Sequence, residues 1–138
     1  MRPVVIEEPE PPAQPVASAG LAPVPAPLAQ AQSDLMSDER EARRSAARAV
    51  LDLQPREEVP PFLVALAELE NASSCRRKQE QVVALGALGD PRALPALERI
   101  DAEPRNGCRR MFQRYDCYHC LRDDLAATLT SLRARIGD

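Results

Sequence analysis

The 138-residue sequence has no tryptophan, a single histidine and only two phenylalanines and two tyrosines. A core made from this chain must therefore consist mainly of Leu, Val, Ile and Ala, which favours packed helices. The sequence also lacks a Gly-rich phosphate-binding loop and an H-E-x-x-H motif, so none of the usual catalytic constellations is present. We therefore expect an all-α protein without enzymatic activity.

Prolines are abundant but unevenly distributed, since 11 of the 14 lie at or before Pro61. Residues 1–36 are rich in Pro and Ala, and we predict a disordered, extended linker there. The alternative, a ligand for a proline-binding domain, depends on PVPAP at residues 23–27. The uncharged run from Pro11 to Ser33 holds six prolines, so no membrane segment is expected. No export signal follows Met1, which places the chain in the cytoplasm if it is complete.

Two helical regions follow the linker. Residues 37–54 begin with Ser37 as a candidate N-cap and carry a thin apolar stripe, which predicts a marginal amphipathic helix. That helix either frays or packs on the domain behind it. Residues 61–138 show repeated helical spacing of apolar residues and are predicted to form one helical domain.

A helix–turn–helix pattern runs from Ala84 to Ile100. Gly89 can adopt the left-handed conformation that ends a helix, and Asp90 with Pro91 can start the next one. Pro95 then falls in the helix interior, where we expect it to bend the helix. The last helix carries the cleanest apolar stripe of the chain, which predicts core positions at Leu121, Leu125, Leu129, Leu132 and Ile136.

Short connections make neighbouring helices antiparallel, so Cys75 and Cys120 should start helices that run in the same direction. The loop with Cys108 and Cys117 begins and ends at the same pole, so the four cysteines should gather there with His119. Three interpretations stay open. The thiols are reduced and packed, or they form one or two disulfides with Cys75–Cys120 preferred, or they bind zinc. The zinc ligands would be Cys75, Cys108, Cys117 and either Cys120 or His119.

The same pole collects arginine and tyrosine, which are common anchors at protein interfaces. Residues 61–138 carry 12 Lys or Arg against 11 acidic residues, and this balance argues against a nucleic-acid partner. A solvated, salt-bridged face is the alternative interpretation. The predicted partner-binding residues are Arg76, Arg77, Arg109, Arg110, Arg114, Tyr115 and Tyr118.

The segment LGDPRALPAL, residues 88–97, resembles the core of a HEAT or HEAT-like (phycobilin-lyase type) repeat. The resemblance covers one clear repeat and implies an α-solenoid of antiparallel helices that binds proteins. It transfers no catalytic residue. About two repeats' worth of helices is fewer than the three that a stable solenoid usually needs, so a homodimer or docking on a partner is expected.

Three blocks between Ser74 and Leu125, namely SCRRK, ALGDPRALPALERI and DCYHCLRDDL, resemble the C-terminal extension of bacterial membrane-anchored Ser/Thr kinases. The resemblance implies a remnant that lacks the catalytic part and faces an oxidising compartment, which would favour disulfides. Our expectation is a non-enzymatic adaptor that binds a protein partner through the Arg/Tyr/Cys pole. A zinc-stabilised binding module, or the kinase remnant, is the alternative.

Overall fold

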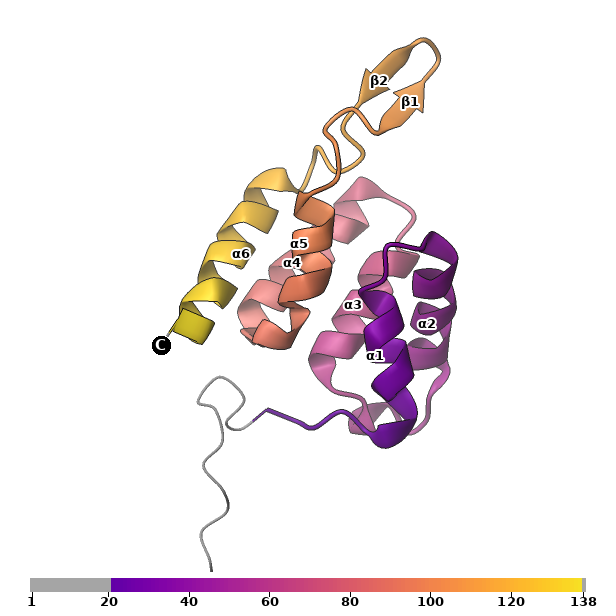
Figure 1. Ribbon diagram of the computed structural model, residues 1–138, viewed down its shortest axis with the longest axis vertical. Coiled ribbons are helices and arrows are strands. Elements are labelled where there is room, and N and C mark those ends of the chain that lie inside the picture. Colours follow the sequence, from indigo (N-terminus) through magenta and orange to yellow (C-terminus); the bar gives the residue numbers. More distant parts are fainter. Residues whose placement is uncertain (1–20, 138) are drawn as a thin grey trace, which may run out of the picture.

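The computed structural model describes residues 21–137, and helices dominate it (Figure 1), which confirms the all-α prediction. The described residues contain one sheet, a two-stranded antiparallel ribbon. The helices pack mainly on their neighbours in sequence, and α6 packs on both α4 and α5. The elements are η2 Ala26–Leu28, α1 Ala29–Leu35, α2 Arg40–Asp52, η3 Arg56–Glu58, α3 Pro61–Asn71, α4 Cys75–Leu88, η4 Pro91–Ala93, α5 Leu94–Asp101, β1 Cys108–Arg110, β2 Gln113–Tyr115 and α6 Arg122–Gly137.

The linker prediction is wrong over residues 26–35, which form η2 and α1. Leu28, Ala31 and Leu35 lie on one face of this segment and are buried in the same core as the later helices. Their spacing of three and four residues is that of a helix face, and α1 packs on α2 and α3. Residues 1–20 of the predicted linker lie outside the described residues.

Helix α2 is a packed helix and not a fraying one. Ala46, Ala47 and Val50 are buried against its neighbours α1 and α3. Arg43, also buried, donates a 2.8 Å hydrogen bond from Nε to Oε1 of Glu70 on α3. The helix is shorter at both ends than the predicted 37–54, and the folded domain begins before residue 61.

The predicted turn between α4 and α5 forms as expected at its caps. Gly89 ends α4 with φ +68°, and the Asp90 carboxylate accepts the Arg92 backbone N–H at 3.0 Å. The prediction for Pro95 is wrong, because Pro91–Ala93 forms a 3-10 turn and α5 starts at Leu94. Pro95 therefore lies in the first turn of α5, where its missing N–H has no helical acceptor.

The stripe on α6 is core over four of its five predicted positions. Leu121, Leu125, Leu129 and Leu132 are buried, but Ile136 is 55% exposed. Ile136 lines an open groove together with Leu94 and Pro95, and none of residues 21–137 covers it. The prediction that Ile136 belongs to the core is therefore wrong.

Candidate partner-binding site

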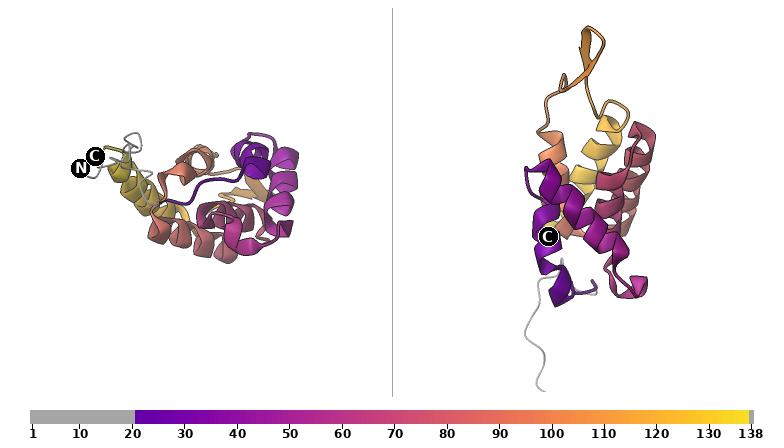
Figure 2. Two further views of the ribbon diagram at one scale, coloured as in Figure 1. Left: turned by 90° about the horizontal axis from the view of Figure 1, so that it is seen from below. Right: turned by 90° about the vertical axis from the view of Figure 1, so that its right-hand side faces the viewer.

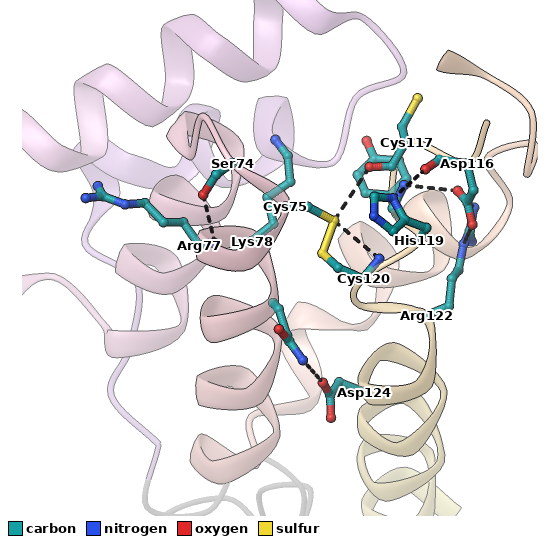
Figure 3. Close-up of a disulfide and its surroundings, with 12 residues drawn as sticks. Ser74, Cys75, Arg77, Lys78, Asp116, Cys117, His119, Cys120, Arg122 and Asp124 are labelled. Atoms are coloured by element: carbon teal, nitrogen blue, oxygen red, sulfur yellow. Dashed lines mark hydrogen bonds and ion pairs between the residues drawn. A yellow bond between two sulfur atoms is a disulfide. The ribbon is translucent and has the colours of Figure 1, made fainter. Parts of the chain in front are cut away.

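The four cysteines gather at one end of the helices, as the antiparallel order requires. Cys75 at the start of α4 pairs with Cys120 just before α6, with their Cα atoms 6.0 Å apart (Figure 3). Cys108 on β1 pairs with Cys117 after β2, with a Cα–Cα distance of 5.1 Å. The preferred disulfide is present together with a second one, and the free-thiol interpretation is wrong because no cysteine stays unpaired.

The zinc interpretation needs thiolates that this pairing does not supply, because all four sulfurs are in disulfides. His119 is exposed, and its Nδ1 lies 3.1 Å from the Asp116 carbonyl oxygen. Within residues 21–137 no group of three or more His, Cys, Asp or Glu side chains is placed to hold a metal. A zinc site would require both disulfides to be reduced.

The loop between α5 and α6 contains a short hairpin, residues 108–115, that projects beyond the helix ends (Figures 1 and 2). Its register places Arg109 opposite Arg114 and Arg110 opposite Gln113. The tip consists of Met111 and Phe112, residues that are 83% and 94% exposed. The hairpin therefore carries two large apolar side chains at its tip, and the arginines Arg109, Arg110 and Arg114 lie on the strands behind them.

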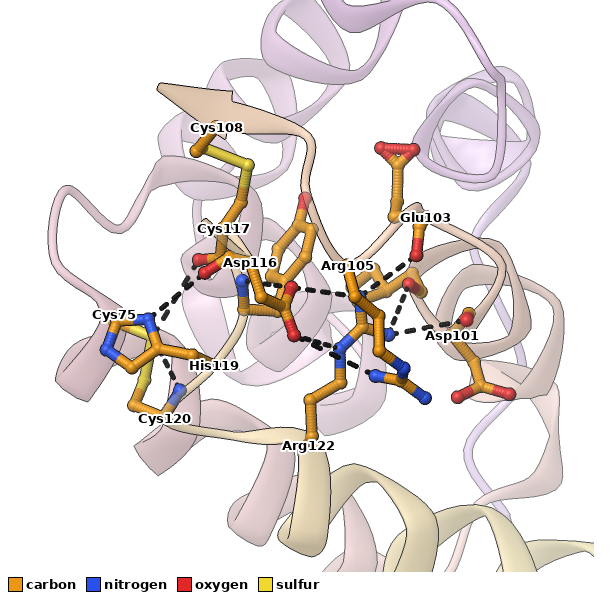
Figure 4. A network of polar contacts seen from close by, with 12 residues as sticks. Cys75, Asp101, Glu103, Arg105, Cys108, Asp116, Cys117, His119, Cys120 and Arg122 are labelled. Carbon is orange, nitrogen blue, oxygen red and sulfur yellow. Dashed lines mark hydrogen bonds and ion pairs between the residues drawn. A yellow bond between two sulfur atoms is a disulfide. The ribbon is translucent and has the colours of Figure 1, made fainter. Parts of the chain in front are cut away.

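Arg122 holds the base of the hairpin on the helices (Figure 4). Its guanidinium grips the Asp116 carboxylate with two hydrogen bonds, Nε to Oδ2 at 2.8 Å and Nη2 to Oδ1 at 3.0 Å. The same group donates to three backbone carbonyls at and after the end of α5, those of Ile100, Asp101 and Glu103, at 3.0–3.3 Å. We call Arg122, Asp116 and these carbonyls the clamp.

Within the clamp, Arg122 and Asp116 each stabilise the charged form of the other. The hydrogen bonds from Arg122 lower the pKa of Asp116 below its usual value, against a smaller opposing effect of burial. The hydrogen bonds to Asp116 in turn raise the pKa of Arg122. Arg105 adds a longer contact of 3.8 Å to the same carboxylate. Both members of the pair therefore stay charged at neutral pH.

Three of the predicted partner-binding residues lie outside the hairpin. Tyr118 is half-buried, packs against the core and lies under the Arg122 guanidinium at 5.7 Å, so it supports the base and is not a surface anchor. Arg76 and Arg77 are exposed in the first turn of α4, next to the Cys75–Cys120 bridge. They share the pole with the hairpin but are not part of it.

Four predicted partner-binding residues do lie together on the hairpin: Arg109, Arg110, Arg114 and Tyr115. Met111 and Phe112 are not among the seven predicted partner-binding residues, although they dominate the exposed tip. Their signal in the sequence is the segment RRMFQR, residues 109–114. Its two large apolar residues stand between arginines and do not belong to an apolar stripe with helical spacing. Lys78, at the same pole, is not a free surface cation, because its Nζ donates to the Ala72 carbonyl. Burial also lowers the pKa of Lys78.

No helix within residues 21–137 combines the length and the apolar character needed to cross a membrane. Comparison of the chain with protein-family models, with curated proteins and with solved structures gives no match. The HEAT-like repeat and the kinase extension therefore stay predictions from the residues that suggested them.

Proposed function

We propose that this chain is a non-enzymatic protein-binding module, built on a short HEAT-like stack, whose contact element is the hairpin of residues 108–115. The observation that carries the proposal is the tip, where Met111 and Phe112 expose most of their surface. Scattered apolar residues are common on surfaces, but two adjacent ones on a protruding turn form a compact apolar knob. Such a knob is suited to fill a pocket in a partner.

The composition of the hairpin supports a protein as the partner. Arg, Met, Phe and Tyr are enriched at protein interfaces, whereas Lys, Glu and Asp are depleted. Residues 106–115 contain three arginines and no Lys, Asp or Glu. No ion pair is formed by Arg109, Arg110 or Arg114 within the described part of the chain. The partner surface should therefore present carboxylates around an apolar pocket.

The anchoring of the hairpin supports a binding role as well. A disulfide closes its base, and the clamp fixes that base to the end of α5 and the start of α6. A contact element that is ordered before binding loses less conformational entropy when it docks. Burial of one large apolar side chain then contributes about 1.5–3 kcal/mol, so Phe112 is the expected hot spot.

The test uses a photo-crosslinking amino acid at position 112 of the full chain, in the cells that naturally produce it. Val83 on α4, which is 50% exposed, provides the matched control position. We expect a discrete protein adduct from position 112 and none from position 83. The partner identified in this way should then bind the purified Phe112→Ala variant about 10–100-fold more weakly than the wild type, and Val83→Ala equally well.

Two results would overturn the proposal. Equal adducts from positions 112 and 83 would show that the hairpin is not the contact element. The proposal also fails if position 112 gives no protein adduct while the purified chain binds anionic lipid vesicles and Phe112→Ala abolishes that binding. This result would assign the hairpin to a membrane surface instead.

A further inference from the structure

The hairpin has little to hold it beyond its base, where the Cys108–Cys117 disulfide closes it and the clamp fixes Asp116. Each strand is three residues long, and Cys108 is the one strand residue that is half-buried, while the other five are exposed. An isolated two-stranded ribbon of this kind is marginal at best in water, because it lacks a third strand or a packed face. The order of the ribbon must therefore come from its base.

Two local features oppose the ribbon. Arg109 faces Arg114 across the strands, and like charges in directly opposed positions are destabilising. Met111 takes φ +56° at the turn, a left-handed conformation that residues with a side chain adopt at some cost. The turn has neither Gly nor Asn, so it offers no strong turn signal of its own.

The Cys108–Cys117 disulfide joins residues nine apart and closes the ribbon at its base. In the chain-entropy model, a loop of this size restricts the open state enough to change the opening equilibrium about 100-fold. The Cys75–Cys120 disulfide has a different position, since it joins α4 and α6. These helices already pack on each other, Val82, Leu85 and Leu125 on them are buried in the core, and Thr128 donates to the Val82 carbonyl at 3.3 Å.

We propose that the Cys108–Cys117 disulfide is a redox control of docking. A dithiol reduces it by two electrons, the sulfur–sulfur bond breaks, each sulfur takes up one proton to become a thiol, and the dithiol is oxidised to its own disulfide. The ribbon then opens and the apolar knob loses its fixed position, while the helices keep their packing. The ordering step stands on the structure alone, and the docking step rests on the proposed function.

The ordering step is tested without a partner. Amide hydrogen exchange is followed by NMR in the full chain for the wild type, for Cys108→Ser/Cys117→Ser, and for the control Cys75→Ser/Cys120→Ser. In the first variant we expect protection of the hydrogen-bonded strand amides, within residues 108–110 and 113–115, to fall about 100-fold or to the level of an unstructured peptide. Protection in α3–α6 should persist. In the control the strand amides should keep wild-type protection.

A dithiothreitol titration of the control variant completes the test, because that variant holds the hairpin disulfide alone. Loss of strand protection should follow the appearance of two thiols per chain. Unchanged strand protection in Cys108→Ser/Cys117→Ser would overturn the inference. So would loss of protection throughout the helices of that variant, because the disulfide would then support the whole domain.

The docking step uses the partner captured at position 112. Cys108→Ser/Cys117→Ser should weaken its binding about as much as Phe112→Ala, and Cys75→Ser/Cys120→Ser should leave it unchanged. If Phe112→Ala has no effect, the proposed function fails while the redox ordering of the ribbon can still hold. If Phe112→Ala weakens binding but the hairpin cysteine variant does not, the redox control fails and the proposed function stands.

Discussion

Replacing Arg122 with glutamine is expected to destabilise the domain strongly, because this side chain joins three separate segments. It binds Asp116 with two hydrogen bonds and also serves three carbonyls at and just after the end of α5. Glutamine keeps a polar head but carries no charge and cannot present the planar fork that matches a carboxylate. The change therefore removes the clamp without introducing an apolar patch.

The magnitude follows from the burial of the pair. The side chains of Arg122 and Asp116 are only 12% and 13% exposed, so solvent screens their attraction weakly. Breaking a well-buried ion pair costs about 3–5 kcal/mol, and charged hydrogen bonds about 1.5–3 kcal/mol each. Because the remaining exposure lets water replace part of the loss, we take the low end, about 3 kcal/mol. For a domain of roughly 120 residues this lowers Tm by about 10 °C.

Arg133 provides the matched control on the same helix. It contacts Glu98 at 3.1 Å, but both side chains are about half exposed, at 52% and 48%. Exposed pairs of this kind contribute about 0–1 kcal/mol, so Arg133→Gln should shift the unfolding midpoint little. Urea unfolding followed by circular dichroism measures both variants against the wild type, with the disulfides intact. Equal losses for Arg122→Gln and Arg133→Gln would refute the reasoning about burial.

Three other changes test the fold. Asp116 has a lowered pKa in the folded state, so its contribution to stability is complete above the ordinary pKa of 3.8 and is lost as pH falls through the lower folded value. The wild type should therefore lose more stability on acidification than Asp116→Asn, as measured by urea midpoints across pH. Leu35→Ala should cost about 2–4 kcal/mol in the same assay if α1 belongs to the core, against less than 1 kcal/mol for the exposed Leu88→Ala. Gly89→Ala should cost about 1–2 kcal/mol because φ at this position is +68°, and no loss would contradict its role as helix cap.

The parts of the fold that the sequence could predict are those that depend on local chemistry. Ser74 accepts the Arg77 backbone N–H at 3.2 Å, and Gly89 and Asp90 form the turn between α4 and α5. Caps of this kind act over two to four residues, so the residue types reveal them. Helix direction then follows from the short connections, and with it the approach of Cys75 to Cys120 across 45 residues.

The parts that the sequence could not predict depend on partners far along the chain. Alanine and proline fit a linker as well as a first helical turn, so α1 is recognisable only through its contacts with α2 and α3. The hairpin has strands of three residues and a turn without Gly or Asn, and its closure comes from a disulfide that had alternatives in the sequence. Local pattern alone leaves such a segment as a loop.

The charge of the site shows the same dependence on distant pairs. Counted along the sequence, Asp116, Asp123 and Asp124 temper the arginines of the pole. In the structure Asp116 is taken up by Arg122, and Asp124 accepts a 2.7 Å hydrogen bond from Gln79 on α4. None of the three acids forms an ion pair with an arginine of residues 108–115. The hairpin therefore keeps its three positive charges uncompensated by these acids, and under the proposed function this excess favours an acidic partner surface.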